Sequence, residues 1–157
     1  MSWKIYCDGS CRNNGYENAY GAYAYVVLDE DENIVHCECI GGPEINTNNR
    51  AEMLAMIKAL EYWDENLEGS VEVNSDSAYV VNAYRQGWVN NWKYNGWKTA
   101  NKQPVKNQDL WIELDSFFQR KDVELIKVKG HADNRWNIFV DNMAQRRSLA
   151  NGESDCD

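Results

Sequence analysis

The sequence has little proline, little histidine and no long apolar run. Its 157 residues include two prolines and two histidines. No stretch approaches the ~18 apolar residues of a membrane-spanning helix. The N-terminal residues 1–4 do not show a charged region followed by an apolar one, which excludes a recognisable secretory signal. We therefore expect a monomeric, cytoplasmic protein without a membrane partner.

Cysteine occurs five times, at positions 7, 11, 37, 39 and 156, and this odd number shows no spacing typical of a disulfide framework. Reduced thiols are the simpler interpretation. The segment His36-Cys37-Glu38-Cys39 resembles half of a zinc site. It lacks a second Cys/His pair at the usual spacing, so a strand with alternating faces is the favoured interpretation.

The formal net charge of -9 by itself argues against a nucleic-acid partner. The distribution of charge matters more, because residues 77–108 contain no Asp or Glu although the chain holds 25 of them. The same segment interleaves lysines with tryptophans and tyrosines. This pattern suits a groove that follows a phosphate backbone. A tryptophan-rich core with a solvated face is the alternative, and the segment alone does not decide between them.

The length fits one domain, which we place at residues 1–150, followed by a polar C-terminal tail at 151–157. Apolar patterns predict strands near residues 3–7, 19–28, 34–40, 71–75 and 123–128. They predict helices near residues 50–64, 77–86, 107–121 and 137–149. This order indicates an α/β fold with a five-stranded mixed sheet, in which three leading antiparallel strands precede strands reached by helical crossovers.

Four acidic residues lie beside apolar stretches that read as core: Asp8, Glu52, Asp76 and Asp141. Carboxylates near a core are unfavourable unless they are paired or bind a cation. If Asp8 and Asp76 end neighbouring parallel strands, both reach the same edge of the sheet, where a divalent metal could hold them. Singly, each has an ordinary explanation, such as a turn residue, a helix N-terminal acid or a helix cap.

Several motifs occur together in a characteristic order. They are Asp8-Gly9-Ser10, Thr47-Asn48-Asn49-Arg50-Ala51-Glu52, Ser75-Asp76-Ser77, Lys129-Gly130-His131 and Asp141-Asn142-Met143-Ala144. Between the third and the fourth lie Trp88–Trp92, Gly96–Thr99 and Pro104–Trp111. Across residues 3–149 the chain resembles the type 1 ribonuclease H family, in its bacterial form with a basic protrusion.

The resemblance implies a ribonuclease H-like fold and an endonuclease that hydrolyses the RNA strand of RNA–DNA hybrids. It implies two-metal-ion catalysis with two Mg²⁺ ions per site, or Mn²⁺ in their place, leaving 5′-phosphate and 3′-hydroxyl ends. The metal-binding and catalytic carboxylates would be Asp8, Glu52, Asp76 and Asp141, and His131 would assist product release or proton transfer. The nucleic-acid contacts would be Asn14, Thr47, Asn48, Asn49, Trp88, Trp92, Lys93, Lys98 and Lys102.

Two positions depart from the family pattern. Ile138 follows Asn137 where Asn-Glu is common, and Ala78 stands where bacterial relatives often carry Gln. Neither change removes a predicted metal ligand. Two rival functions remain: a strand transferase of the integrase or transposase type, which usually closes its site with Glu, and an inactive hybrid-binding module, which would be expected to have lost a carboxylate.

Overall fold

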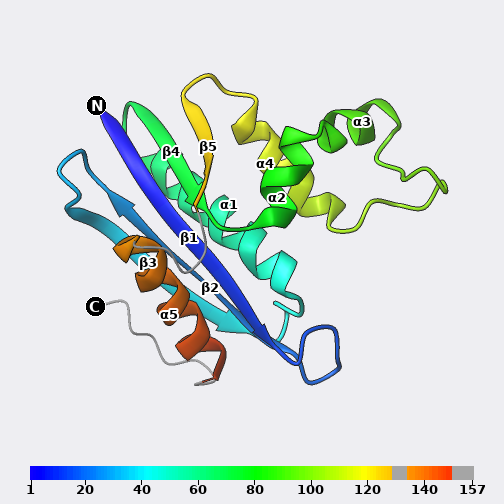
Figure 1. Cartoon of the computed structure of the whole chain (residues 1–157), viewed down its shortest axis with the longest axis horizontal. Helices are drawn as coiled ribbons and strands as arrows, with labels where there is room; N and C mark the ends of the chain where they lie inside the picture. Colours follow the sequence, from blue (N-terminus) through cyan, green and yellow to red (C-terminus); the bar gives the residue numbers. More distant parts are fainter. Residues whose placement is uncertain (129–133, 150–157) are drawn as a thin grey trace.

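A five-stranded sheet forms the centre of the protein, with the strand order β3-β2-β1-β4-β5. We describe a computed structural model, which covers residues 1–128 and 134–149 (Figure 1). The strands are β1 (Ser2–Arg12), β2 (Tyr20–Leu28), β3 (Ile34–Gly42), β4 (Ser70–Ser75) and β5 (Val123–Lys127). The helices are α1 (Asn48–Asn66), α2 (Ala78–Arg85), α3 (Trp88–Tyr94), α4 (Gln108–Phe118) and α5 (Arg135–Leu149).

The pairing confirms the predicted mixed sheet. Strands β1, β2 and β3 form an antiparallel meander, whereas β1 pairs in parallel with β4 and β4 with β5. Short hairpin connections join the first three strands. Helix α1 supplies the crossover to β4, and α2 to α4 supply the crossover to β5, because parallel neighbours need a long connection.

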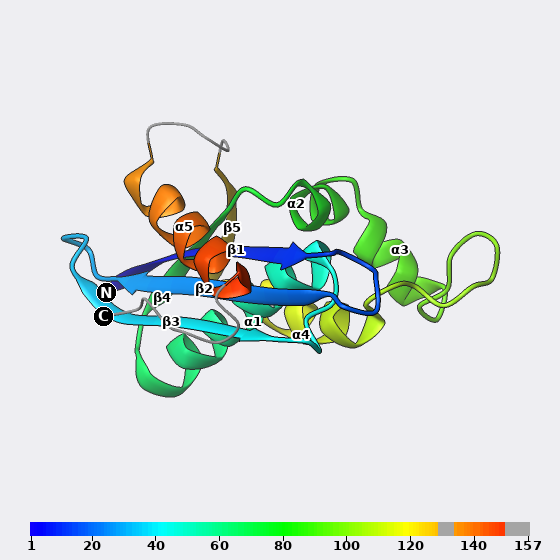
Figure 2. The same ribbon diagram turned by 90° about the horizontal axis from the view of Figure 1, so that it is seen from below.

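The alternation of side chains along β1 separates two cores. Ile5 and Cys7 lie in the core shared with α1 and α4, whereas Tyr6 packs with residues of α5 such as Val140. Helix α1 thus covers one face of the sheet and α5 the other (Figure 2). Side chains of α1 and side chains of α5 therefore approach β1 from opposite faces of the sheet.

Strand β1 is longer than the sequence pattern predicts. We expected it to end at Cys7 and a polar turn to begin at Asp8, but β1 continues to Arg12. The reason is tertiary: Asp8 pairs with Ala24 of β2, and this pairing continues to Arg12 opposite Tyr20. Asp8 therefore lies within a strand rather than at its end.

The segment 36–39 is a strand with alternating faces, as favoured from the sequence. His36 stacks on Tyr62 of α1 with ring centroids 3.9 Å apart. Cys39 points to the other face, where its thiol donates to the Met143 carbonyl of α5 at 3.4 Å. Within the described residues, these side chains form no metal-binding group and the cysteines form no disulfide.

Helix α1 begins as the capping residues predict. The Thr47 hydroxyl accepts a hydrogen bond from the Arg50 amide at 3.1 Å. The apolar face of the helix, which includes Met53, Met56 and Leu60, is fully buried against the sheet. No helix in residues 1–128 or 134–149 combines the length and the apolar character needed to cross a bilayer.

Helix α3 and the loop after it project from the body of the protein beside α4 (Figures 1 and 2). This protrusion, which we define as residues 87–107, carries most of the acid-free segment noted in the sequence. The predicted tail at 151–157 and the predicted loop histidine His131 lie outside the described residues.

Candidate active site

Asp8 and Asp76 are brought together by the parallel pairing of β1 with β4. The last pair in this ladder joins Tyr6 to Asn74. Asp8 lies two residues after Tyr6 on β1, and Asp76 lies two residues after Asn74, directly past the end of β4, so the two acids are at matching positions. At this point β4 ends and β1 continues alongside β2. A Lys127 ammonium group donates to the Asp76 carbonyl at 2.6 Å and ties β5 to the same place.

Glu52 reaches this position because Gly9 allows α1 to approach β1 closely. A Cβ atom on Gly9 would lie 2.3 Å from the Ala51 carbonyl carbon and 2.4 Å from the Glu52 amide nitrogen. Neither backbone atom could move aside without shifting the helix. The missing side chain of Gly9 therefore sets the distance between α1 and β1, and with it the position of Glu52.

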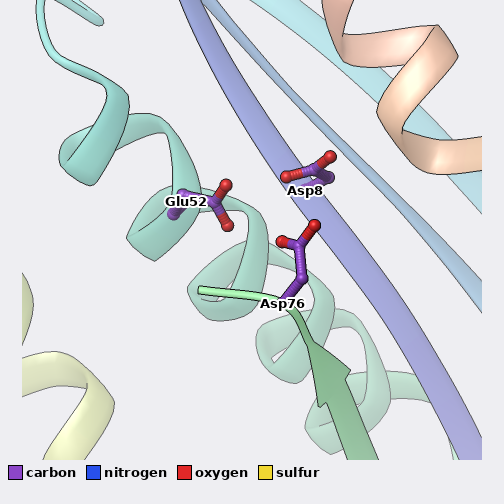
Figure 3. Close-up of side chains that lie close together, drawn as sticks. All are labelled: Asp8, Glu52 and Asp76. Carbon is purple, nitrogen blue, oxygen red and sulfur yellow. The ribbon is translucent and has the colours of Figure 1, made fainter. Parts of the chain in front are cut away.

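The three carboxylates converge on one point (Figure 3). Asp8, Glu52 and Asp76 each offer an oxygen atom, and these atoms lie within 4.8 Å of one another. Asp8 is 3% exposed, so it is a fully buried acid. Its Oδ1 accepts a hydrogen bond from the Gly9 amide at 2.9 Å. Glu52 Oε2 is buried and accepts no hydrogen bond from the described residues.

The electrostatics show how costly this arrangement is without a cation. Burial raises the pKa of Asp8 far above that of an ordinary aspartate, and the charge of Glu52 raises it further. Burial also raises the pKa of Glu52, and the charge of Asp76 adds to the effect. The pKa of the Cys7 thiol behind them is raised by burial and by all three carboxylates. Without a cation, the site therefore favours the protonated forms of Asp8 and Glu52 over their charged forms.

Asp141 reaches the group from the opposite layer. It lies on α5, and its carboxyl group is hydrogen-bonded to that of Asp8, which contributes to the raised pKa of Asp8. The Gln145 amide, one turn further along α5, donates to both Asp141 oxygens at 3.2 and 3.3 Å. Asp141 is half-buried and is not among the three residues whose oxygen atoms lie within 4.8 Å of one another. The structure thus brings Asp8, Glu52 and Asp76 into one group and places Asp141 of α5 against Asp8.

This donor set fits a divalent metal. Hard cations prefer carboxylate oxygens as ligands, and a buried carboxylate oxygen without a donor, such as Glu52 Oε2, needs a positive partner. A divalent ion between Asp8, Glu52 and Asp76 would supply that partner and would offset the burial and the repulsion that raise the pKa values of Asp8 and Glu52. Asp141 could then serve the same ion or a neighbouring one.

A polar cleft of about 570 Å³ lies at the N-terminus of α1. Its lining includes four residues expected to contact nucleic acid: Asn14, Thr47, Asn48 and Asn49. The Asn14 side-chain oxygen accepts from the Asn48 amide at 2.5 Å, and the Asn48 side-chain oxygen accepts from the Cys11 amide at 2.7 Å. Both side chains therefore have their oxygens occupied by protein, which leaves their NH₂ groups as donors for a ligand.

The sequence interpretation missed the other wall of this cleft, formed by Arg50, Tyr79, Lys106 and Asn107. Arg50 binds Asp109 through two hydrogen bonds of 2.9 and 3.2 Å and donates to Asn107 at 3.1 Å, which joins α1 to the start of α4. The only sequence signal for these residues was the basic character of the segment 77–108. Gly9 was also missed as a spacing residue, because its short contact involves residues more than forty positions away in sequence.

The predicted residues of the protrusion do not share one environment. Lys98 and Lys102 are exposed on the loop after α3, and Trp88 is 40% exposed on the helix itself. Trp92 instead packs on Trp111 of α4 with ring centroids 5.5 Å apart. Lys93 forms an ion pair of 2.7 Å with Asp115 of α4.

Comparison with known proteins places the chain in a family. Residues 1–148 match the family model of RNase H. The ribonuclease H of Clostridium botulinum is 46% identical over 89% of this chain and 91% of its own length. The ribonuclease H of Treponema denticola is 41% identical over 92% and 95%. The chain therefore belongs to the RNase H family.

Solved structures agree with this assignment. LC9-RNase H1, described as a type 1 RNase H with the type 2 active-site motif, is 25% identical, with a TM-score of 0.77 over 98% of this chain and 74% of that one. A foamy viral protease-reverse transcriptase chain solved in complex with dsDNA has a TM-score of 0.80 at 23% identity and covers 94% of both chains. The second likeness concerns the fold alone.

Proposed function

We propose that this protein is an endoribonuclease that hydrolyses the RNA strand of RNA–DNA hybrids and leaves 5′-phosphate and 3′-hydroxyl ends. The observation that carries the proposal is the convergence of Asp8, Glu52 and Asp76 within 4.8 Å, with Asp141 beside them, in a chain of the RNase H family. The protein would act as a monomer in the cytoplasm, with residues 1–150 as its single domain.

The cofactor in this proposal is Mg²⁺, with two ions per site and Mn²⁺ as a substitute. Bound Mg²⁺ would supply an activated water and stabilise the charge on the leaving oxygen. The part of the protein is to hold four carboxylates in place before the substrate arrives. Gly9 sets the depth of Glu52, the β1–β4 register aligns Asp8 with Asp76, and Gln145 orients Asp141. His131 would assist product release or proton transfer.

The substrate would lie across the carboxylates, with one strand in the polar cleft and one along the protrusion. Asn14, Thr47, Asn48 and Asn49 would donate hydrogen bonds to the hybrid backbone near the site. Trp88, Lys98 and Lys102, which are exposed, would form the surface for the DNA strand, and Trp92 and Lys93, also predicted there from the sequence, would support it from within the protrusion. An RNase H must recognise the 2′-hydroxyl of the strand that it cuts, because this group distinguishes RNA from DNA.

A cleavage assay tests the proposal. In Mg²⁺ the wild-type protein should cut the RNA strand of a labelled hybrid and leave DNA–DNA and RNA–RNA duplexes intact, and EDTA should abolish cutting. Asp8→Asn and Asp76→Asn should each reduce cleavage by orders of magnitude, since an amide is a poorer ligand for Mg²⁺. Asp122→Asn is the control: it removes a carboxylate that binds Arg120 and lies outside the candidate site, so this variant should cut at the wild-type rate.

Three outcomes would count against the proposal. Cleavage by Asp8→Asn close to the wild-type rate would remove these carboxylates from the mechanism. Hybrid binding without cleavage by the wild type would favour an inactive binding module. Joined DNA strands among the products would favour a strand transferase.

A further inference from the structure

Two acidic residues are buried among the described residues, Asp8 and Asp115. Asp8 belongs to the candidate active site. Asp115 lies on α4, outside that site, and its side chain is 9% exposed. A buried carboxylate is costly unless it is paired and hydrogen-bonded, so the surroundings of Asp115 call for an explanation of their own.

Asp115 is surrounded by donors, and one of them comes from the protrusion. Lys93 of α3 lies 2.7 Å from Asp115 Oδ2. The Gln119 amide donates to Oδ1 at 3.0 Å, and the Tyr84 hydroxyl of α2 lies 3.5 Å from the same oxygen. Burial and the charge of Asp115 together raise the pKa of Tyr84, which keeps this hydroxyl protonated as a donor. Asp115 therefore joins α2, α3 and α4 at one point.

Helix α3 needs such an anchor. It has seven residues, and its N-cap residue Gly87 forms no side-chain capping hydrogen bond. Isolated helices shorter than ~12–15 residues are marginal in water. Val89 is buried, Trp92 packs on Trp111 of α4 and Lys93 pairs with Asp115 of α4. Trp92 and Lys93 follow Val89 by three and four residues, so all three lie on one side of the helix. Trp92 supplies an aromatic contact with α4, and Lys93 supplies the one ion pair found between α3 and α4 in the described residues.

We propose that Lys93 and Asp115 form a latch that holds α3 against α4 and so positions the protrusion for the hybrid, and that Lys93 is a positioning residue rather than a phosphate contact. The latch rests on the proposed function, because it acts on the surface offered to the hybrid. Trp88 is exposed on the same helix, and the loop with Lys98 and Lys102 follows directly in the chain. Releasing α3 would displace these exposed groups together.

The two roles of Lys93 predict opposite effects for Asp115→Asn. If Lys93 binds phosphate, removing its protein partner adds a free positive charge, and hybrid binding should stay equal or tighten. If Lys93 is a latch, the same change releases α3, and binding should weaken. Should the docked fraction of α3 fall to about 0.1, the apparent Kd would rise about 10-fold.

The experiment measures Kd for a long RNA–DNA hybrid in EDTA, where no cutting occurs, over a series of salt concentrations. The latch predicts that Asp115→Asn and Lys93→Met raise Kd to a similar extent with an unchanged salt slope. It also predicts that the double variant binds no worse than either single one. If Lys93 bound a phosphate group, Lys93→Met would instead make the slope shallower by about 0.9. Lys98→Met is the matched control, since Lys98 is exposed like Lys93 but forms no ion pair with the described residues, and it should show this shallower slope.

A second readout follows α3 directly. Limited trypsin digestion after Lys98 and Lys102 should be faster in both latch variants. Melting temperatures of all variants should be measured as well, so that every Kd is determined at a temperature where the variant is folded. Wild-type Kd for Asp115→Asn, or a shallower slope for Lys93→Met, would overturn the latch. Failure of the proposed function would look different: the wild type itself would neither bind nor cut the hybrid, while trypsin would still report whether Asp115 holds α3.

Discussion

Gly9 of β1 and Ala51 of α1 lie in direct backbone contact, so that a Cβ atom on Gly9 would fall 2.3 Å from the Ala51 carbonyl carbon. This contact explains how Glu52 on one layer reaches Asp8, whose side chain faces the other layer. The arrangement of the candidate site therefore depends on Gly9, because only a residue without a side chain allows this backbone contact.

Gly9→Ala should damage both stability and cleavage. The added methyl group must push α1 away from β1, and overpacking of this kind typically costs about 1–3 kcal/mol. The shift carries Glu52 away from Asp8 and Asp76, so hybrid cleavage should fall at least 10²-fold. Gly41→Ala is the control, because its methyl group would meet the Arg147 and Tyr20 side chains at 3.0 Å, and side chains can yield. Equal effects of the two substitutions on cleavage would contradict the spacing role.

Asp8→Asn should stabilise the metal-free protein, and the gain should grow with pH. The folded-state pKa values of Asp8 and Glu52 are raised above their unfolded values of roughly 4. The folded chain therefore holds more protons than the unfolded chain above about pH 4, and wild-type stability from these groups is lost as pH rises through that window. In EDTA the gain from Asp8→Asn should be near zero at about pH 4 and on the order of 2 kcal/mol at about pH 7.

Asp109→Asn should show the opposite sign in the same denaturation series. The hydrogen bonds from Arg50 hold the pKa of Asp109 below its usual range. Its contribution is present at neutral pH and disappears as pH falls, so this variant should lose stability at neutral pH only. An Asp8→Asn gain of the same size at every pH would show that charge repulsion is not its cause.

The exposed lysines of the protrusion should carry the salt dependence of hybrid binding. Lys98→Ala with Lys102→Ala should raise KM and make the slope of log K against log salt shallower, by up to about 0.9 for each phosphate group that the variant no longer binds. The effect on kcat should be smaller, because the carboxylates are untouched. Wild-type KM and slope on long hybrids would mean that the hybrid is held elsewhere.

Trp88→Ala should weaken hybrid binding without altering the salt slope. Its ring is 40% exposed, so it can stack against the nucleic acid, and its removal takes away packing but no charge. Trp92→Ala provides the comparison. Because Trp92 packs on Trp111, its loss should appear first as a lower melting temperature. A lower melting temperature for Trp88→Ala with unchanged Kd would assign Trp88 to the core instead.

His131→Ala should slow turnover while leaving the Mg²⁺ dependence largely intact. General acid–base assistance is typically worth ~10²–10⁴-fold, and His131 belongs to a different motif from the four carboxylates. The measurement is single-turnover cleavage across a Mg²⁺ series. A loss as complete as that of Asp8→Asn would rule out a supporting role.

The sequence alone predicted a cation site and determined the types of most of the elements. Acids flanked by apolar residues predicted a cation site, and strand and helix periodicities predicted the mixed sheet, because both signals are local. The predicted end of β1 was wrong for the same reason. Pairing with β2 extends the strand past Cys7, and this pairing cannot be read from the residues next to Cys7 in the sequence.

Tertiary structure decided what depends on residues distant in the chain. Three relationships join positions more than twenty residues apart: the contact of Gly9 with α1, the matching positions of Asp8 and Asp76, and the ion pair of Lys93 with Asp115. A lysine in an acid-free segment looks like a phosphate contact in the sequence. The helix face that it occupies gives Lys93 a buried carboxylate as its partner, and only packing against α4 could place it there.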